Sequence, residues 1–215
     1  NYSISSYANG TLTITQATRT VTADNQTRAY GDVNPTLTVS YSGFKNSETS
    51  AVLTTLPTAT TVAINTSIVG TYPIVPSGGV SGNYAFTYVN GTLTVTKAVL
   101  TATANNQTKV YGDANPALTI TYTGLKNGET AAVILSPPTA STTATLTSSV
   151  GTYPITLAGG LNGNYSFSFV NGTLTVTQAT IVATADNKTR VYGDPNPAFT
   201  ITYTGFRNGE TSAVI

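Results

Sequence analysis

Few side chains in this sequence could perform acid–base, nucleophilic or metal chemistry. The 215 residues include no histidine and no cysteine, so the usual general base and the usual thiol nucleophile are absent. The carboxylates are Asp24, Asp32, Glu48, Asp113, Glu129, Asp186, Asp194 and Glu210. Nearly all of them are the same two or three positions repeated along the chain, which suits a structural role better than a catalytic pair. We expect no enzyme and no cofactor, we assign no catalytic or metal-binding residue, and the ligand-binding residues stay unknown.

Two acidic segments raise the alternative of calcium binding. Asp32-Val33-Asn34 and Asp113-Ala114-Asn115 offer side-chain oxygens, and calcium takes roughly six to eight oxygen ligands. Asp and Asn also close turns by bonding their own backbone, and the proline that follows each segment favours turns. The position of Asp24 and Asp186 carries Asn105 in the middle copy, so the extra ligand charge is not maintained. We expect turns, with weak calcium sites as the less favoured alternative.

An intramolecular Lys–Asn isopeptide bond is known from surface stalks in general and requires a lysine at one fixed place in each copy. The equivalent positions are Lys45 and Lys126 with Arg207, Lys109 with Arg28 and Arg190, and Lys97 with Gln178. Because each set contains a residue that cannot form the bond, we expect the crosslink to be missing from at least some copies. An intact mass without loss of ammonia would agree with this expectation.

The threonine stripe Thr92, Thr94 and Thr96 could be a carbohydrate- or ice-binding face, but an ordinary solvent-facing sheet surface is the simpler interpretation. Tyrosines that could stack on sugars, Tyr84, Tyr88 and Tyr122, fall on strand faces that we assign to the core.

Charge and hydropathy exclude further classes. Nine basic and eight acidic residues give a net charge of +1 with no basic run, so a nucleic-acid partner is not expected. No apolar run approaches the ~20 residues of a membrane span, so any membrane attachment must come from parts outside this sequence. The absence of both Cys and Met removes the most easily oxidised side chains, which fits an extracellular, cell-surface location.

The elements that position these residues repeat along the chain. Tyr30-Gly31-Asp32 recurs at Tyr111-Gly112-Asp113 and at Tyr192-Gly193-Asp194, with a spacing of 81 residues both times. The period predicts the C-terminal strands of a preceding repeat over 1–16, complete repeats over 17–97 and 98–178, and the N-terminal part of a following repeat over 179–215. No Gly, Pro or Ser cluster separates the copies, so we expect the chain to cross each boundary in extended form and the array to be stiff and linear.

Within one copy the composition favours strands. Asn90-Gly91 between two alternating segments predicts a type I′ hairpin over 83–97, in which Tyr88 faces Leu93. Residues 99–104 and 118–123 alternate as half-buried strands, and Pro154 suggests that the strand over 150–157 lies at a sheet edge. Asn127 could cap one short helix over 128–135, which Pro137 and Pro138 would end.

An ordered set of motifs runs through each complete copy. In the second copy, from Tyr111 to Val176, these are Tyr-Gly-Asp-x-Asn-Pro, Thr-Tyr-Thr-Gly, Asn-Gly-Glu-Thr, Val-Gly-Thr-Tyr-Pro-Ile, Asn-Tyr-x-Phe and Val-Asn-Gly-Thr-Leu-Thr-Val. The set resembles the YGX-type MBG repeats of bacterial surface proteins. The resemblance implies tandem, mostly-β, β-grasp-like units of long extracellular adhesins, including gliding-motility adhesins, and it carries over no catalytic residue. The residues alone equally allow an immunoglobulin-like β-sandwich repeat.

The function expected from these features is a structural stalk or filament segment that extends a distal adhesive region from the cell. Its immediate partners would be neighbouring repeats of the same polypeptide, and a surface glycan or protein ligand would bind through other regions. Two alternatives remain. Each repeat could itself bind glycan or protein weakly and multivalently, or chains could self-associate through exposed strand edges.

Overall fold

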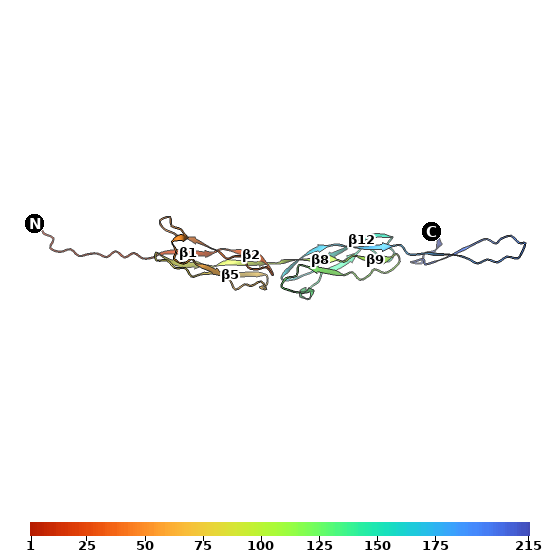
Figure 1. Cartoon of the computed structure of the whole chain (residues 1–215), viewed down its shortest axis with the longest axis horizontal. Helices are drawn as coiled ribbons and strands as arrows, with labels where there is room; N and C mark the ends of the chain where they lie inside the picture. The colour runs from red at the N-terminus through yellow and green to blue at the C-terminus, as the bar shows by residue number, and fades with distance from the viewer. The chain divides into compact units, whose positions relative to one another are not determined.

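The computed structural model describes all of residues 1–215, which divide into two compact units, Asn1–Ala98 and Val99–Ile215. Strands account for 41% of the chain and helical segments for only 4%, so the predicted mostly-β class is confirmed. Figure 1 traces the elements along the chain. No helical segment is both long enough and apolar enough to span a lipid bilayer.

The first unit contains two sheets. Its elements are β1 (Ala17–Ala23), β2 (Gln26–Ala29), β3 (Val39–Ser42), a 3-10 turn (Ser50–Val52), β4 (Thr58–Thr60), β5 (Gly70–Ser77), β6 (Tyr84–Val89) and β7 (Gly91–Thr96). One sheet has the strand order β3-β1-β6 and the other β2-β7-β5-β4. Residues 1–16 precede β1, contain no strand and are exposed throughout.

The second unit repeats this arrangement. Its elements are β8 (Ala98–Ala104), β9 (Gln107–Val110), β10 (Ile120–Thr123), a 3-10 turn (Ala131–Val133), β11 (Thr139–Thr142), β12 (Gly151–Ala158), β13 (Tyr165–Val170), β14 (Gly172–Thr177), β15 (Val182–Ala185), β16 (Ile201–Thr204) and a last 3-10 turn (Ser212–Val214). The sheets are β10-β8-β13 and β11-β12-β14-β9, followed by the two-stranded β15-β16. The domain boundaries drawn from the 81-residue period remain predictions.

The predicted hairpin over 83–97 is wrong, because β6 and β7 belong to different sheets. β6 pairs in parallel with β1, from Ala17 with Tyr84 onward, and β7 pairs in parallel with β2. Both ladders keep the same spacing of 67 residues, as does the hydrogen bond from Thr92 N to Asn25 Oδ1 at 2.8 Å. The first and last strands of the repeat therefore form one long parallel pair that passes from one sheet into the other. Such pairing excludes the purely antiparallel immunoglobulin-like sandwich.

Gly91 lies where this long strand pair passes from one sheet to the other, and it allows two backbone segments to come close together there. Neither Asn90 nor Gly91 has the positive φ that both central residues of a type I′ turn require. A Cβ on Gly91 would lie 2.4 Å from the carbonyl oxygen of Ala23 on the neighbouring strand. The glycine therefore lets two backbones touch at the crossing, and only a residue without a side chain fits.

The type I′ turn lies elsewhere, in the segment predicted to begin a helix. Asn127 and Gly128 have φ of 53° and 72°, and Glu129 N donates to Lys126 O at 2.9 Å. The helix predicted over 128–135 is reduced to the three-residue 3-10 turn Ala131–Val133. Because Asn127 is used for the turn, it cannot cap a helix, and the prolines that follow leave too few residues for one to grow.

The predicted edge position of the proline-containing strand is also wrong. β12 lies between β11 and β14 and pairs antiparallel with both. Pro154 pairs with Thr173 of β14, whereas the ladder with β11 begins only at Ile155. The missing donor is tolerated because β11 has already ended at this point.

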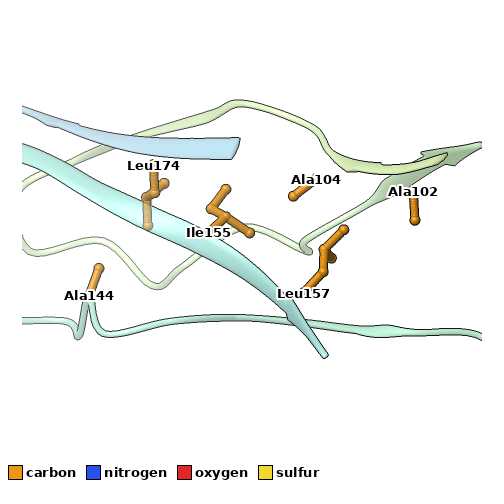
Figure 2. Packing of buried hydrophobic residues seen from close by; sticks show 6 residues of the cluster. All are labelled: Ala102, Ala104, Ala144, Ile155, Leu157 and Leu174. Atoms are coloured by element: carbon orange, nitrogen blue, oxygen red, sulfur yellow. The ribbon is translucent and has the colours of Figure 1, made fainter. Parts of the chain in front are cut away.

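Each complete repeat closes on a small apolar core. In the second, Ala102, Ala104, Ala144, Ile155, Leu157 and Leu174 converge between the sheets, as Figure 2 shows. The first has Ala23, Ala63, Ile74 and Leu93 in a similar cluster. The alternating strand over 99–104 is thereby confirmed, since β8 buries every second residue. Tyr84 is buried as predicted, but Tyr88 is 41% exposed and lies outside the core.

A candidate junction between successive repeats

The Tyr-Gly-Asp segment of the second copy is a tightly held loop after β9. Asp113 N donates to Val110 O at 3.0 Å, and Gly112 takes a φ of 83°. Lys109 is only 6% exposed, and its ammonium donates to the carbonyl oxygens of Asp113 and Thr145 at 3.1 and 2.5 Å. These bonds tie the loop to its own repeat, so that Tyr111 and the Asp113 carboxylate are presented in fixed positions.

The first copy fixes its loop with an arginine at the position equivalent to Lys109. Arg28 Nε donates to Asn34 Oδ1 at 2.7 Å, and the other guanidinium nitrogens donate to the carbonyl oxygens of Ala29 and Ile64. Asn34 in turn donates to Ala63 O at 2.6 Å. The cation and the Asn of the Tyr-Gly-Asp-x-Asn-Pro motif therefore act as internal supports, and their hydrogen bonds explain the burial of both charges.

A second motif forms the opposite side of the junction. Asn208 and Gly209 make a type I′ turn with φ of 54° and 75°, and Glu210 N donates to Arg207 O at 2.9 Å. The turn holds Arg207 and Glu210 on either side of its tip. Like the equivalent Asn127, Asn208 forms a turn and caps no helix, and this turn projects one cation and one carboxylate together.

These two motifs meet within the second unit. The Tyr111 hydroxyl donates to Glu210 Oε1 at 2.6 Å, and Arg207 Nη1 lies 3.1 Å from Asp113 Oδ1. Between the two polar contacts, a Cβ on Gly112 would come within 2.4 Å of Arg207 Cβ, so the glycine permits direct backbone-to-turn contact. Phe206, Ile181 and Gln178 border a pocket of about 230 Å³ beside Tyr111. A hydrogen bond, an ion pair and a close glycine contact thus join residues 98–178 to residues 179–215.

The motifs of this junction are those of one domain family. The sequence profile of the MBG domain (YGX type) matches residues 20–94, 100–175 and 181–215. The chain belongs to this family. The matches lie in tandem and confirm the resemblance of the Tyr-Gly-Asp and Asn-Gly-Glu-Thr motifs. No curated protein matches the chain. MBG repeats are a non-catalytic repeat family.

Inside each complete MBG repeat the glutamate of the Asn-x-Glu-Thr motif has another contact. Glu48 Oε2 accepts from the Tyr84 hydroxyl at 2.5 Å, and Glu129 Oε2 accepts from Tyr165 in the same way. The tyrosine oxygen also accepts from the backbone N–H of Lys45 at 3.0 Å. The bond to Glu48 raises the pKa of Tyr84, because that bond requires the protonated phenol. The motif glutamate therefore anchors its own turn with one oxygen.

Two further carboxylates, Asp24 and Asp186, make local contacts. Asp24 Oδ2 accepts from Thr38 at 2.6 Å, and Asp186 accepts from Thr200 and Thr202, which lowers the pKa of Asp186. Asp113 is paired with Arg207. No three His, Cys, Asp or Glu residues gather in a way that could hold a metal ion. The Lys109 ammonium, a candidate for the isopeptide bond, is bonded to two backbone carbonyl oxygens.

The sequence analysis did not predict the buried charge of Arg19, which unlike Arg28 and Lys109 is left without hydrogen-bond partners at two nitrogens. Arg19 is 1% exposed and packs its guanidinium against the rings of Phe44, Tyr41 and Tyr84, with the carbon Cζ 2.8 Å from the Phe44 ring centre. Its Nε and Nη1 atoms have no hydrogen-bond partner, and burial lowers its pKa. The 81-residue period could have indicated this burial, because the equivalent positions carry the apolar residues Leu100 and Ile181.

Proposed function

We propose that this chain is a structural segment of a long bacterial cell-surface adhesin, located outside the cell, in which docked MBG repeats hold a distal adhesive region away from the surface. The single observation that carries the proposal is the junction of Tyr111 and Asp113 with Glu210 and Arg207. A flexible string of domains needs a linker without such contacts. Here the two motifs that contact each other are ones that recur in every copy.

The geometry of the junction suits resistance to bending better than recognition of a ligand. Two polar contacts lie on either side of the Gly112 backbone, so rotation about one of them stretches the other. The Arg207 and Asp113 side chains are 45% and 44% exposed, and such a pair alone contributes at most about 1 kcal/mol. Most of the restraint therefore comes from the hydrogen bond of Tyr111 to the Glu210 carboxylate and from the close contact of the Gly112 backbone with Arg207.

Spin-label distance measurements on the full chain test this restraint. The chain contains no cysteine, so Thr152→Cys and Ala198→Cys place one label on each side of the junction without competing thiols. We expect a narrow distance distribution that broadens when Tyr111→Phe removes the hydroxyl. Tyr153→Phe is the matched control, because its hydroxyl donates to Ser149 O inside one repeat at 2.9 Å. A broad distribution that Tyr111→Phe leaves unchanged would contradict a stiff stalk.

A second candidate function has one specific observation in its favour. Phe86 and Tyr88 stack with ring centres 6.3 Å apart, Phe167 and Phe169 do so at 6.1 Å, and Tyr88 is 41% exposed. Exposed aromatic rings suit stacking on sugars, so each repeat could itself bind glycan weakly, with avidity from many copies. Titrating the full chain with millimolar monosaccharides and following the ring resonances by NMR tests this. Unchanged ring resonances would contradict glycan binding by the repeats, and the stalk would be the one remaining proposal.

A further inference from the structure

The first unit has an unfilled pocket at the end where the repeat begins. Its volume is about 340 Å³, and it is bordered by Lys45, Asn46, Glu48 and Tyr84 together with Gln16 and Ala17. Gln16, Ala17, Lys45 and Glu48 are the counterparts, two periods earlier, of Gln178, Ala179, Arg207 and Glu210. These later residues border the pocket beside Tyr111. The two pockets are thus one site in two copies, and only the later one receives a Tyr-Gly-Asp loop.

The polar groups of this pocket are available for the same contacts. Glu48 accepts from Tyr84 through Oε2, which leaves Oε1 open, and Glu210 uses Oε1 to accept from Tyr111. Lys45 is exposed and stands where Arg207 pairs with Asp113. The turn is already formed, since Asn46 and Ser47 have φ of 53° and 60° and Glu48 N donates to Lys45 O at 2.9 Å. The site therefore needs no rearrangement to bind a loop that offers a phenol and a carboxylate.

We propose that this pocket is the acceptor for the Tyr-Gly-Asp loop of a further MBG repeat, joined to this chain through residues 1–16. The tyrosine donates to Glu48, the aspartate pairs with Lys45, and the glycine between them allows the loop backbone to meet the turn. Residues 1–16 carry Asn9-Gly10 and end in Gln16, the counterparts of Asn90-Gly91 and Lys97 at the end of a complete repeat. This inference rests on the proposed docking of successive repeats and names the partner of one particular surface.

The occupant follows from charge and from continuity with the occupied junction. The pocket presents one cation and one carboxylate, and the Tyr-Gly-Asp loop presents a carboxylate and a hydroxyl donor in the matching order. A small acidic ligand would pair with Lys45 but would leave Glu48 Oε1 without a hydrogen-bond donor. A hydrophobic partner would satisfy neither group.

Site-directed crosslinking in a lengthened chain tests the assignment. Residues 17–82 are duplicated ahead of Asn1, so that residues 1–16 complete an added repeat with its own Tyr-Gly-Asp loop. Asp32→Cys in the added copy and Lys45→Cys in the acceptor are then the only thiols, because the chain has no cysteine of its own. We expect a short bis-maleimide to join them within one molecule, seen by intact mass and peptide mapping. Both positions are exposed in the first unit, so neither change disturbs a core.

Two variants sharpen the result. Val62→Cys in place of Lys45→Cys is the matched control, because Val62 is 80% exposed. Val62 lies at the other end of the repeat, next to Ala63, whose carbonyl oxygen accepts from the Asn34 side chain. We expect at least a tenfold lower crosslinking rate there. Gly31→Val in the added loop should lower the rate at Lys45→Cys by a similar factor, because a side chain at the equivalent Gly112 would overlap Arg207 Cβ.

Equal rates at the two cysteines, or crosslinks only between molecules, would overturn the assignment. These outcomes are separable from failure of the stalk. A narrow spin-label distribution across Tyr111 and Glu210 with no crosslink at Lys45→Cys rejects this acceptor alone. A broad distribution together with no crosslink rejects the docking of repeats altogether.

Discussion

Replacing Arg19 by leucine should stabilise the first unit, which is the opposite of the usual effect of removing a buried, contacting side chain. Arg19 is 1% exposed, and its Nε and Nη1 atoms are unpartnered. Burying an unpaired cation costs several kcal/mol, of which stacking on aromatic rings returns about 2 kcal/mol. The equivalent positions of the other copies carry apolar residues, Leu100 and Ile181, and Leu100 is 0% exposed. The copy with Ile181 keeps a phenylalanine, Phe206, at the position equivalent to Phe44, so an apolar side chain is compatible with that ring.

The expected gain from Arg19→Leu is therefore about 2 kcal/mol, similar to the roughly 1–4 kcal/mol gained when buried ion pairs are replaced by well-packed apolar side chains. In a domain of this size that raises Tm by roughly 10 °C. Hydrogen exchange of the β1 and β7 amides in the full chain measures the first unit separately from the second. Arg28→Leu is the matched control and should destabilise by at least about 2 kcal/mol, because the Ile64 and Ala29 carbonyls and Asn34 would lose their donor. Unchanged or faster exchange in Arg19→Leu would refute the reasoning.

Two further predictions concern the same unit. Gly91→Ala should lower the free energy of unfolding by about 3 kcal/mol, because its Cβ would lie 2.4 Å from the Ala23 carbonyl oxygen. Gly82→Ala is the control: a Cβ there meets nothing within 4 Å, so the free energy of unfolding should change by no more than about 0.5 kcal/mol. Urea unfolding monitored by circular dichroism compares the two variants. The raised pKa of Tyr84 means that the stability from its protonated phenol is complete below about pH 10 and is lost as the pH rises further. Unfolding midpoints between about pH 8 and pH 11 should fall less steeply in Tyr84→Phe, and parallel curves would contradict the linkage.

The sequence predicted burial better than pairing. The alternating pattern correctly placed Tyr84 and Leu93 on the core face, and these side chains are 3% and 0% exposed. It could not identify the neighbouring strand, because a period of two residues is the same in a hairpin and in a parallel ladder. The dipeptide Asn-Gly was equally ambiguous. At Asn127-Gly128 it is a type I′ turn, and in the Asn90-Gly91 pair it provides a contact point with a distant backbone.

The junction was beyond sequence reasoning for a related reason. The period of 81 residues showed which motifs recur, and family resemblance identified the repeat, but neither states that Tyr111 contacts a glutamate 99 residues further along the chain. Local rules explain the Tyr-Gly-Asp and Asn-Gly-Glu motifs individually as turns. Only their distance in space shows that they bind each other, and sequence separation of this size carries no local signal.

The dual use of each motif implies that stability within a repeat and docking between repeats are coupled. Lys109 fixes the loop by bonding Asp113 O and Thr145 O, and the same loop presents Tyr111 to Glu210. The motif glutamate likewise has two kinds of partner. Glu129 accepts from a tyrosine of its own repeat, Tyr165, and Glu210 accepts from a tyrosine of the preceding copy, Tyr111. Damage to either motif therefore weakens a repeat and releases its neighbour together. Tandem repeats that contact each other couple nearest neighbours. In the stalk proposed above, the residues that fold each unit would therefore also resist the load.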